Sequence, residues 1–426
     1  KLTGVRNFTK FRQDGEGMLQ APDGLPCALL SINMLNFKIY NDVMGYSEGD
    51  ALLKAFARIL EREAPRPVLV ARMLADAFLV LFPYKGKGEL VTYCEAYSRA
   101  LNGFIVSREQ NYQLELRSGI CCVEDSDASD INSLLDRANM ALKPIKVKGA
   151  AQWKFYDHTM RDKLLREKDL EIRMEKALAD GEFLVYIQPK YWVGTRALAG
   201  GEALVRWKSP DQGFLSPGEF IPLFEKNRFI VKLDQFMFTS VCGLLRQWLD
   251  AGIEPRPLSV NVSRMQFHTP DFVERYIRIK SLYAIPDGLL ELEFTESIFF
   301  DNVALLSSAV HELRRAGIKC SIDDFGAGYS SLNVLKALPV SVLKLDGMFF
   351  RTAKDDEQAK IVIRNIMRMA GELKMATVAE GVETHEQVAF LETTGCDIIQ
   401  GYVFARPMPA AEFTELLAGE GGHAER

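Results

Sequence analysis

The feature that most constrains the fold is a repeating unit in the C-terminal half of the chain. From Phe183 onward, a short apolar run is followed by acidic or amide residues and then by an amphipathic helical pattern. Strands that alternate with helices favour a parallel sheet, and eight of them over about 240 residues predict a (β/α)8 barrel of the TIM type. The eight strand candidates are Phe183–Gln188, Leu198–Trp207, Leu258–Val262, Leu290–Phe294, Lys319–Asp323, Val342–Leu345, Met375–Val378 and Asp397–Phe404.

The N-terminal part of the chain has a different organisation. Apolar strand-like runs at Cys27–Ile32, Val68–Phe82 and Leu114–Val123 alternate with helical patterns, which predicts a separate mixed α/β domain. A polar, charge-rich segment with apolar residues at helical spacing follows. Because 426 residues exceed what one hydrophobic core usually serves, we predict an α/β domain at 1–157, a connecting helix at 158–180 and a barrel domain at 181–426.

Composition narrows the choice of partners and metals. The formal net charge is −5 without a basic block, so no DNA or RNA duplex is expected as a partner. Seven scattered cysteines without a CxxC pair predict buried, reduced thiols, and five scattered histidines make a histidine-ligated metal improbable. No apolar run is long enough to span a bilayer, which predicts a cytoplasmic location. The start at Lys1, without an initiator Met, gives the hypothesis that a sensor or membrane anchor precedes this segment.

Polar residues recur on or just after consecutive barrel strands, whose carboxyl ends converge on one mouth. They are Glu202, Asn261, Glu293, Asp323, Asp324, Lys344, Asp346, Glu380, Glu383 and Gln400. Taken singly, an Asp or Glu after a strand is more often a helix cap or a solvated group. However, Glu202, Glu293 and Asp323 lie within apolar runs, where an unpaired carboxylate is costly to bury. Divalent cations would offset that cost.

Oxygen ligands without Cys or His favour Mg²⁺ or Mn²⁺, and the Asp323-Asp324 step can supply one carboxylate to each of two ions. Two ions about 3.5 to 4 Å apart can clamp a phosphodiester and lower the pKa of a water between them. Lys344 is suited to hold or deprotonate that water, or to stabilise negative charge at phosphorus. The alternative, a salt bridge to the acidic cluster, stays open and is compatible with the first role. Gly326 and Gly328 form either an ordinary turn or a loop that closes over substrate.

The C-terminal motifs together resemble the EAL family of cyclic di-GMP phosphodiesterases. They are EALVRW (202–207), NVS (261–263), ELEFTES (291–297), DDFG (323–326), KLD (344–346), AEGVE (379–383) and QGY (400–402). The match covers the whole C-terminal half in order. The resemblance implies a TIM-type barrel with an atypical strand direction, hydrolysis of cyclic di-GMP to linear 5'-pGpG with two Mg²⁺ or Mn²⁺ ions, and a homodimer formed through this domain.

The resemblance also implies roles for individual residues. By resemblance, Glu202, Asn261, Glu293 and Asp323 are expected to bind one metal ion. Asp323, Asp324 and Glu380 are expected to bind the second. Lys344 and Glu380 would contact the attacking water, with Glu383 in support. Substrate contacts would come from Gln188, Leu204, Arg206, Asp346 and Gln400, and Glu296 would position the DDFG loop.

The N-terminal half resembles the GGDEF family of diguanylate cyclases through LTGVRN (2–7), NFKIYNDVMGYSEGD (36–50) and RMLADAF (72–78). The family signature is degraded here. Ala77 stands where an acidic residue is expected, and Asn33 replaces a metal-binding Asp, which is a better Mg²⁺ ligand than a neutral amide. Asn41, Asp50 and Asp76 remain, and with Asn33 they make up a degenerate nucleotide site. We therefore predict an inactive structural or regulatory domain with at most weak GTP affinity.

Two other functions compete with a phosphodiesterase. A receptor would bind cyclic di-GMP without cleaving it, but such receptors usually lack one or more metal or loop residues, and this chain keeps them all. A barrel enzyme of unrelated metabolism would account for the fold but not for the motif set.

Overall fold

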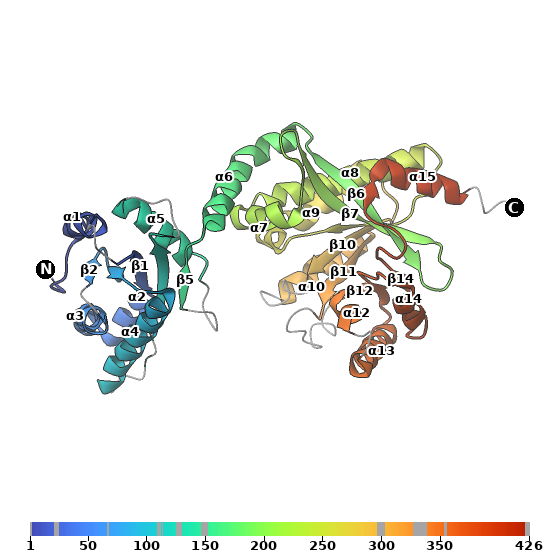
Figure 1. Cartoon of the computed structure of the whole chain (residues 1–426). Coiled ribbons are helices and arrows are strands. Elements are labelled where there is room, and N and C mark those ends of the chain that lie inside the picture. Colours follow the sequence, from blue (N-terminus) through green and yellow to red (C-terminus); the bar gives the residue numbers. More distant parts are fainter. Residues whose placement is uncertain are drawn as a thin grey trace. The chain divides into compact units, whose positions relative to one another are not determined.

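The computed structural model describes residues 2–20, 25–65, 68–108, 112, 114–124, 130–145, 152–295, 303–326, 339–352 and 356–421 (Figure 1). The chain divides into two compact units, Lys1–Lys168 and Asp169–Arg426. All seven cysteines are buried, as the sequence predicts. Among the described residues, none of the helices combines the length and the apolar character needed to cross a bilayer.

The first unit is a five-stranded sheet of order β2-β3-β1-β4-β5, in which β4 and β5 are parallel and the other neighbours are antiparallel. On β1, Leu30 and Ile32 pack into one core while Leu29 packs into another, because successive strand side chains point to opposite faces. The strands are β1 (Cys27–Met34), β2 (Leu69–Arg72), β3 (Ala77–Pro83), β4 (Leu116–Cys122) and β5 (Trp153–Phe155). The helices are α1 (Phe8–Leu19), α2 (Phe37–Met44), α3 (Tyr46–Arg62), α4 (Lys87–Ser107) and α5 (Ile131–Leu142).

The apolar run Val68–Phe82 is not one strand but two, β2 and β3, joined by a turn. Ala75 has a left-handed backbone with φ of 48°, which an extended strand cannot continue through. The Arg72 guanidinium closes the turn by donating to the Ala75 carbonyl at 2.8 and 2.6 Å. The degraded signature therefore lies in a hairpin.

The second unit contains a closed eight-stranded barrel. Its strands follow the order β6-β14-β13-β12-β11-β10-β9-β7, and pairing of β7 with β6 closes the ring. β6 is antiparallel to both of its neighbours, whereas the remaining barrel neighbours are parallel. The predicted TIM-type barrel is confirmed, and β6 is the strand of atypical direction.

Helices α8, α9, α10, α13 and α14 lie on the outside of the barrel (Figure 1). The strands are β6 (Phe183–Trp192), β7 (Leu198–Ser209), β8 (Gly213–Leu215), β9 (Leu258–Asn261), β10 (Leu290–Thr295), β11 (Ile318–Phe325), β12 (Val342–Leu345), β13 (Ala376–Ala379), β14 (Ile398–Ile399) and β15 (Met408–Pro409). The helices are α6 (His158–Ala179), α7 (Pro217–Asn227), α8 (Ile230–Asp250), η1 (Arg264–His268, a 3-10 helix), α9 (Phe272–Leu282), α10 (Val303–Arg315), α12 (Met348–Thr352), α13 (Glu357–Glu372), α14 (His385–Glu392) and α15 (Ala410–Gly421).

Two details of the predicted repeat are wrong. The first two barrel strands are joined by a hairpin rather than by a helix, since β6 and β7 pair directly. The last strand covers Ile398–Ile399 instead of Asp397–Phe404. After β14 the backbone passes close to Val382, and a Cβ at position 401 would lie 2.0 Å from the Val382 carbonyl oxygen, so glycine is required there.

Helix α6 occupies the segment predicted to connect the domains, and the division between the two units falls within it. Its C-terminal part packs on the second unit, where Leu170 and Ala177 are buried with Phe183 and Trp207. The Trp207 indole N–H donates to the Glu182 carboxylate at 2.7 Å and fixes the end of this helix to β7.

Candidate active site

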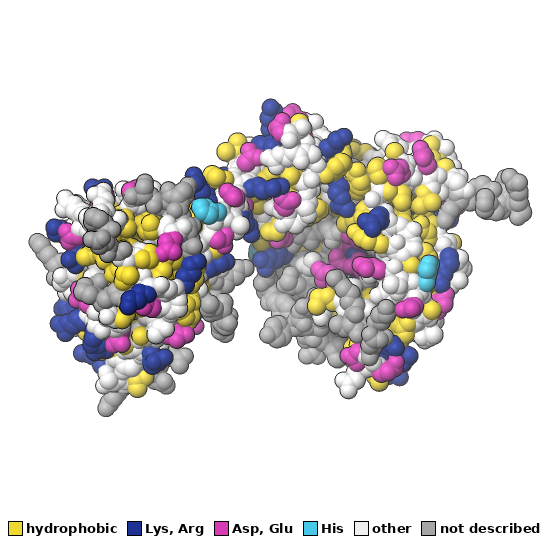
Figure 2. All heavy atoms as spheres, viewed as in Figure 1, with side chains coloured by type: hydrophobic (Ala, Val, Ile, Leu, Met, Phe, Trp, Pro, Cys, Tyr) yellow, Lys and Arg dark blue, Asp and Glu magenta, His cyan; other side chains and the backbone are white. Residues whose placement is uncertain are grey.

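The side chain of Lys344, on β12, lies at the centre of the candidate site and is fully buried. Its ammonium contacts a carboxylate from each of four other segments: Glu202 on β7 at 3.4 Å, Glu293 on β10, Asp323 on β11 at 3.1 Å and Glu380 after β13 at 2.6 Å. Residues far apart in the sequence are thus brought to one point because their parallel strands end at the same side of the barrel. Figure 2 shows acidic side chains gathered in a hollow of this unit.

The four carboxylates keep Lys344 charged. Burial alone would lower the pKa of Lys344, but attraction by the surrounding carboxylates outweighs burial and raises that pKa well above its ordinary value. The salt bridges between Lys344 and the acidic cluster, the alternative role that the sequence left open for this lysine, are therefore present. They leave Lys344 as a fixed positive charge in the centre of the site.

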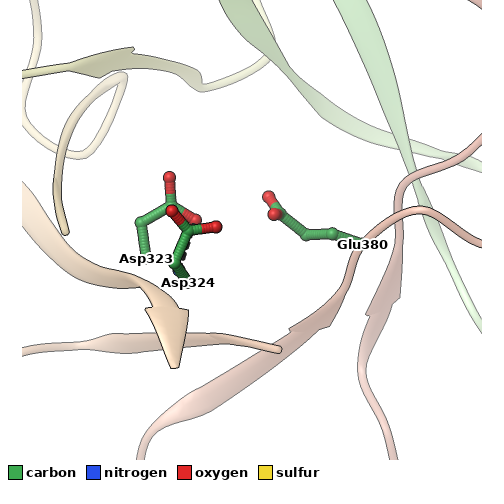
Figure 3. Close-up of side chains that lie close together, drawn as sticks. All are labelled: Asp323, Asp324 and Glu380. Atoms are coloured by element: carbon green, nitrogen blue, oxygen red, sulfur yellow. Dashed lines mark hydrogen bonds between the residues drawn. The ribbon is translucent and has the colours of Figure 1, made fainter. Parts of the chain in front are cut away.

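An irregularity in β11 brings Asp323 and Asp324 to the same place. Consecutive residues of a regular strand point to opposite faces. Here Asp324 has a left-handed backbone with φ of 55°, and the register between β11 and β12 shifts between Ile322 and Phe325. Such a bulge re-aims side chains. One carboxylate oxygen each from Asp323, Asp324 and Glu380 lies within 4.8 Å of the others (Figure 3).

Glu202 is held by two amides on the barrel rim. Its Oε1 accepts a hydrogen bond from the Asn261 amide at 2.6 Å, and its Oε2 accepts one from Gln400 at 2.7 Å. The same Gln400 nitrogen also donates to Gln188 at 3.1 Å. Gln400 Oε1 is buried and has no hydrogen-bond partner among the described residues. Both Gln188 and Gln400 are buried, so their amides are fixed in place.

Leu204 and Arg206 line a cavity of about 220 Å³ that also borders Asn261. Both side chains are half-buried on β7. The Arg206 guanidinium lies over the Tyr186 ring at 5.5 Å and donates to the Val205 carbonyl at 2.8 Å, which fixes its orientation at the edge of the site. A cation beside the carboxylate centre is well placed to meet an anionic ligand.

Four other predicted residues lie at the edge of the site or outside the described residues. Glu383 is exposed just before α14, and its backbone N–H donates to Gln387. Asp346 accepts a hydrogen bond from the Met348 N–H at the start of α12, at 2.6 Å. Glu296 lies outside the described residues, as does Gly328.

Three carboxylates of the centre, those of Glu202, Glu380 and Asp324, are hard to keep ionised without added positive charge. Burial, followed by repulsion from Glu293, raises the pKa of Glu202. Burial and the neighbouring carboxylates also raise the pKa of Glu380 well above its ordinary value, although Lys344 opposes them. The pKa of Asp324 is raised to about 6 by burial and by repulsion from Asp323 and Asp346. The site therefore carries more negative charge than Lys344 balances.

These properties fit divalent ions such as Mg²⁺ or Mn²⁺. The donors are carboxylate and amide oxygens, the kind of ligand that hard cations prefer. Glu380 Oε1 lies 2.6 Å from Lys344 Nζ but accepts no hydrogen bond of acceptable geometry from the described residues. A buried, under-satisfied carboxylate oxygen beside Asp323 and Asp324 is what a cation site requires.

Two buried ionisable residues of the site were not predicted from the sequence. Lys190 on β6 contacts Glu293 at 2.9 Å; burial alone would raise the pKa of Glu293, but Lys190 and Lys344 lower it to about 2. Asp234 on α8 accepts hydrogen bonds from the Ser263 N–H at 3.0 Å and the Gln266 amide at 3.1 Å, which anchors the loop after Asn261. Neither residue stands out in the sequence, because polar Gln188 lies near Lys190 and charged Lys232 lies near Asp234.

The candidate nucleotide site of the first unit is spread over β1, α2, α3 and the β2–β3 turn. Asn33 pairs directly across the sheet with Ala77, so the two departures from the cyclase pattern are neighbours. Asn41 Oδ1 is buried without a hydrogen-bond partner among the described residues. Asp50 is exposed on α3, and Asp76 is half-buried in the turn.

Comparison with protein families assigns both units. The EAL domain model matches residues 172–407, more than half of the chain, and the model of the diguanylate cyclase GGDEF domain matches residues 1–152. The chain therefore belongs to the EAL domain family and carries a GGDEF domain before the EAL domain.

Two relatives match most of this chain. The cyclic di-GMP phosphodiesterase NbdA of Pseudomonas aeruginosa is 31% identical over 420 residues, which are 98% of this chain and 53% of NbdA. The bifunctional diguanylate cyclase/cyclic di-GMP phosphodiesterase MucR of the same organism is 30% identical over 392 residues, 92% of this chain and 57% of MucR. The chain thus spans a little over half the length of these relatives.

A solved structure resembles the barrel unit. It is the PaMucR phosphodiesterase in complex with c-di-GMP, which matches with a TM-score of 0.55 and 35% identity over 57% of this chain and 99% of that chain.

Proposed function

We propose that the barrel hydrolyses cyclic di-GMP to linear 5'-pGpG with the help of two divalent ions, Mg²⁺ or Mn²⁺. The observation that carries this proposal is the convergence of four carboxylates from separate strands on the buried ammonium of Lys344. The naming of NbdA and MucR as cyclic di-GMP phosphodiesterases supports the choice of substrate.

The proposed ligands fall into two overlapping sets. One set is Asp323, Asp324 and Glu380, whose carboxylate oxygens lie within 4.8 Å of one another. The other set is Glu202, Asn261, Glu293 and Asp323, of which the three carboxylates contact Lys344 and the amide contacts Glu202. When bound, such a pair of ions would polarise the phosphoryl oxygens and make a nearby water more acidic.

The reaction adds one water to one phosphodiester. The water oxygen forms a bond to phosphorus, the bond from phosphorus to the 3' oxygen breaks, and that oxygen takes up a proton as the 3' hydroxyl. Lys344 is placed to orient the attacking water and to stabilise negative charge at phosphorus, because its ammonium lies among the carboxylates. Glu380, whose carboxylate lies 2.6 Å from the Lys344 ammonium, is proposed to accept the water proton, with Glu383 in support.

Substrate contacts are proposed for residues around the mouth. Arg206 offers a guanidinium to a phosphate, and Leu204 offers an apolar surface beside it. Gln188 and Gln400 offer fixed amides, and Asp346 lies at the start of α12 on the same rim.

The GGDEF domain is proposed to be an inactive regulatory or structural domain that binds GTP weakly at most. The missing carboxylates at Asn33 and Ala77, adjacent across the sheet, support this proposal. A homodimer through the EAL domain is proposed from the family resemblance.

The test is incubation of the purified chain with cyclic di-GMP and Mg²⁺ or Mn²⁺, with chromatographic separation of products. We expect pGpG to accumulate with metal and not with EDTA. A Glu202→Ala variant should lose turnover, whereas Glu254→Ala, at an exposed ion pair with Arg256, should not. If the chain binds cyclic di-GMP tightly but forms no product, its function is that of a receptor and not of a hydrolase.

A further inference from the structure

Lys190 is a buried cation inside the barrel, close to the candidate active site. It lies on β6, two residues after Gln188, and both side chains are buried. Side chains two apart on a strand share a face. Lys190 therefore points into the barrel interior together with Gln188.

The Lys190 ammonium joins two strands beneath the carboxylate centre. It donates to Glu293 Oε1 at 2.9 Å and to the Ser259 hydroxyl at 2.7 Å. The Ser259 hydroxyl in turn donates to the Gly201 carbonyl at 3.4 Å, so it presents a lone pair to Lys190. Both acceptors are buried, so the position of the ammonium is fixed by protein atoms.

Glu293 has different partners at its two oxygens. Oε1 is bound by Lys190, and Oε2 is bound by Lys344. The Glu293 side chain has no exposed surface, so water does not provide an alternative donor. The rotation of this carboxylate is therefore set from both sides.

We infer that Lys190 is a positioning residue that locks one oxygen of Glu293 and so presents the other to the ions at the catalytic centre. The inference rests on the proposed function, because it takes Glu293 as a metal ligand. Groups that hold a metal ligand from behind typically change metal affinity or activity by about 10- to 100-fold when removed. Lys190 holds its ligand from β6, the antiparallel strand that closes the barrel.

Orientation and charge predict opposite effects of removing Lys190. The loss of a positive charge near a cation site would by itself strengthen metal binding. The loss of the hydrogen bond leaves a buried carboxylate oxygen without a donor and lets the carboxylate turn, which weakens binding. Metal affinity therefore distinguishes a positioning role from a purely electrostatic one.

The experiment measures Mn²⁺ binding to the full chain by electron paramagnetic resonance, without nucleotide. Lys190→Met should weaken Mn²⁺ binding by about 10- to 100-fold, and Lys190→Arg, which keeps a charged donor, should recover much of the loss. Ser259→Ala, which removes one anchor of Lys190, should cause a smaller loss. Lys280→Met is the matched control, because Lys280 is also buried but bonds Asp287 and the Ala316 carbonyl, and it should leave Mn²⁺ binding unchanged.

Steady-state hydrolysis provides a second readout. Raising Mn²⁺ should restore kcat in Lys190→Met while the KM for cyclic di-GMP stays near the wild-type value, since the defect lies in metal binding. Equal or tighter Mn²⁺ binding by Lys190→Met would overturn the inference. If that variant does not fold, wild-type Mn²⁺ binding by Ser259→Ala would overturn it instead.

The two proposals fail in different ways. Weaker Mn²⁺ binding by Lys190→Met in a chain that does not cleave cyclic di-GMP would refute the proposed function alone. Hydrolysis by the wild type, with unchanged Mn²⁺ affinity in the variant, would refute the positioning role alone. A wild type that binds no Mn²⁺ would refute both.

Discussion

Replacing Lys344 with Met removes a cation that contacts four carboxylates at once. Lys344 is fully buried and pairs with Asp323 at 3.1 Å and Glu380 at 2.6 Å, in addition to Glu202 and Glu293. Removing one partner of a buried ion pair costs about 3 to 5 kcal/mol, because it leaves an uncompensated buried charge. In a domain of this size, each kcal/mol of lost stability lowers Tm by about 2 to 4 °C. The expected fall in Tm is therefore about 6 to 20 °C.

Divalent ions should reverse much of this destabilisation. Ligand binding to the folded state at 100 times Kd stabilises a protein by about 2.7 kcal/mol. Ions that bind among the freed carboxylates also supply the missing positive charge. We therefore expect the difference in Tm between Lys344→Met and the wild type to be large in EDTA and clearly smaller in saturating Mn²⁺. The kcat should stay about 10²- to 10³-fold low even with Mn²⁺, because the electrostatic contribution of the ammonium is lost.

The assay is thermal unfolding at pH 8, with EDTA and with Mn²⁺, followed by hydrolysis of cyclic di-GMP. Lys280→Met serves as a control for the loss of a buried lysine, and its change in Tm should be the same with and without Mn²⁺. Identical melting of Lys344→Met and the wild type in EDTA would refute the reasoning, and so would an unchanged kcat.

Three further predictions concern pH, packing and the first unit. Burial raises the pKa of Asp234 to about 7 from 3.8. Between these two values the folded state holds a proton that the unfolded state releases, so the stability of the wild type should fall as the pH rises from about 4 to about 7. In urea titrations, the fall should be at most about 4 kcal/mol relative to Asp234→Asn. Parallel stability profiles of the wild type and the variant would contradict this prediction. Gly401→Ala should lose about 1 to 3 kcal/mol in the same titrations, because the new Cβ would meet the Val382 carbonyl, and wild-type stability would show that the turn relaxes. Incubation with GTP and Mg²⁺ should yield no cyclic di-GMP, since Asn33 and Ala77 lack carboxylates, and any product by chromatography would refute an inactive GGDEF domain.

Much of the barrel follows from residue pattern alone. Apolar runs bounded by helical patterns gave the order of the strands, because burial on both faces makes barrel strands continuously apolar. Carboxylates within those runs indicated the centre, because an isolated buried charge is too costly to keep without a partner. Both are local properties of the chain.

Pairing between distant segments could not be obtained in this way. The apolar run of β6 does not indicate the direction of this strand, and only its antiparallel pairing with β7 establishes that a hairpin joins the two strands. The same limit hid the partner of Lys190, since Glu293 is 103 residues away along the chain. Only closure of the barrel brings these two charges together.

The chain by itself determined which residue types lie at the strand ends and in what order. The tertiary structure decided how they point. Regular strand alternation would send Asp323 and Asp324 to opposite faces, and only the left-handed backbone at Asp324, held where β11 shifts register against β12, turns both carboxylates toward Glu380. That conformation is set by strand pairing across the barrel, which no stretch of sequence encodes alone.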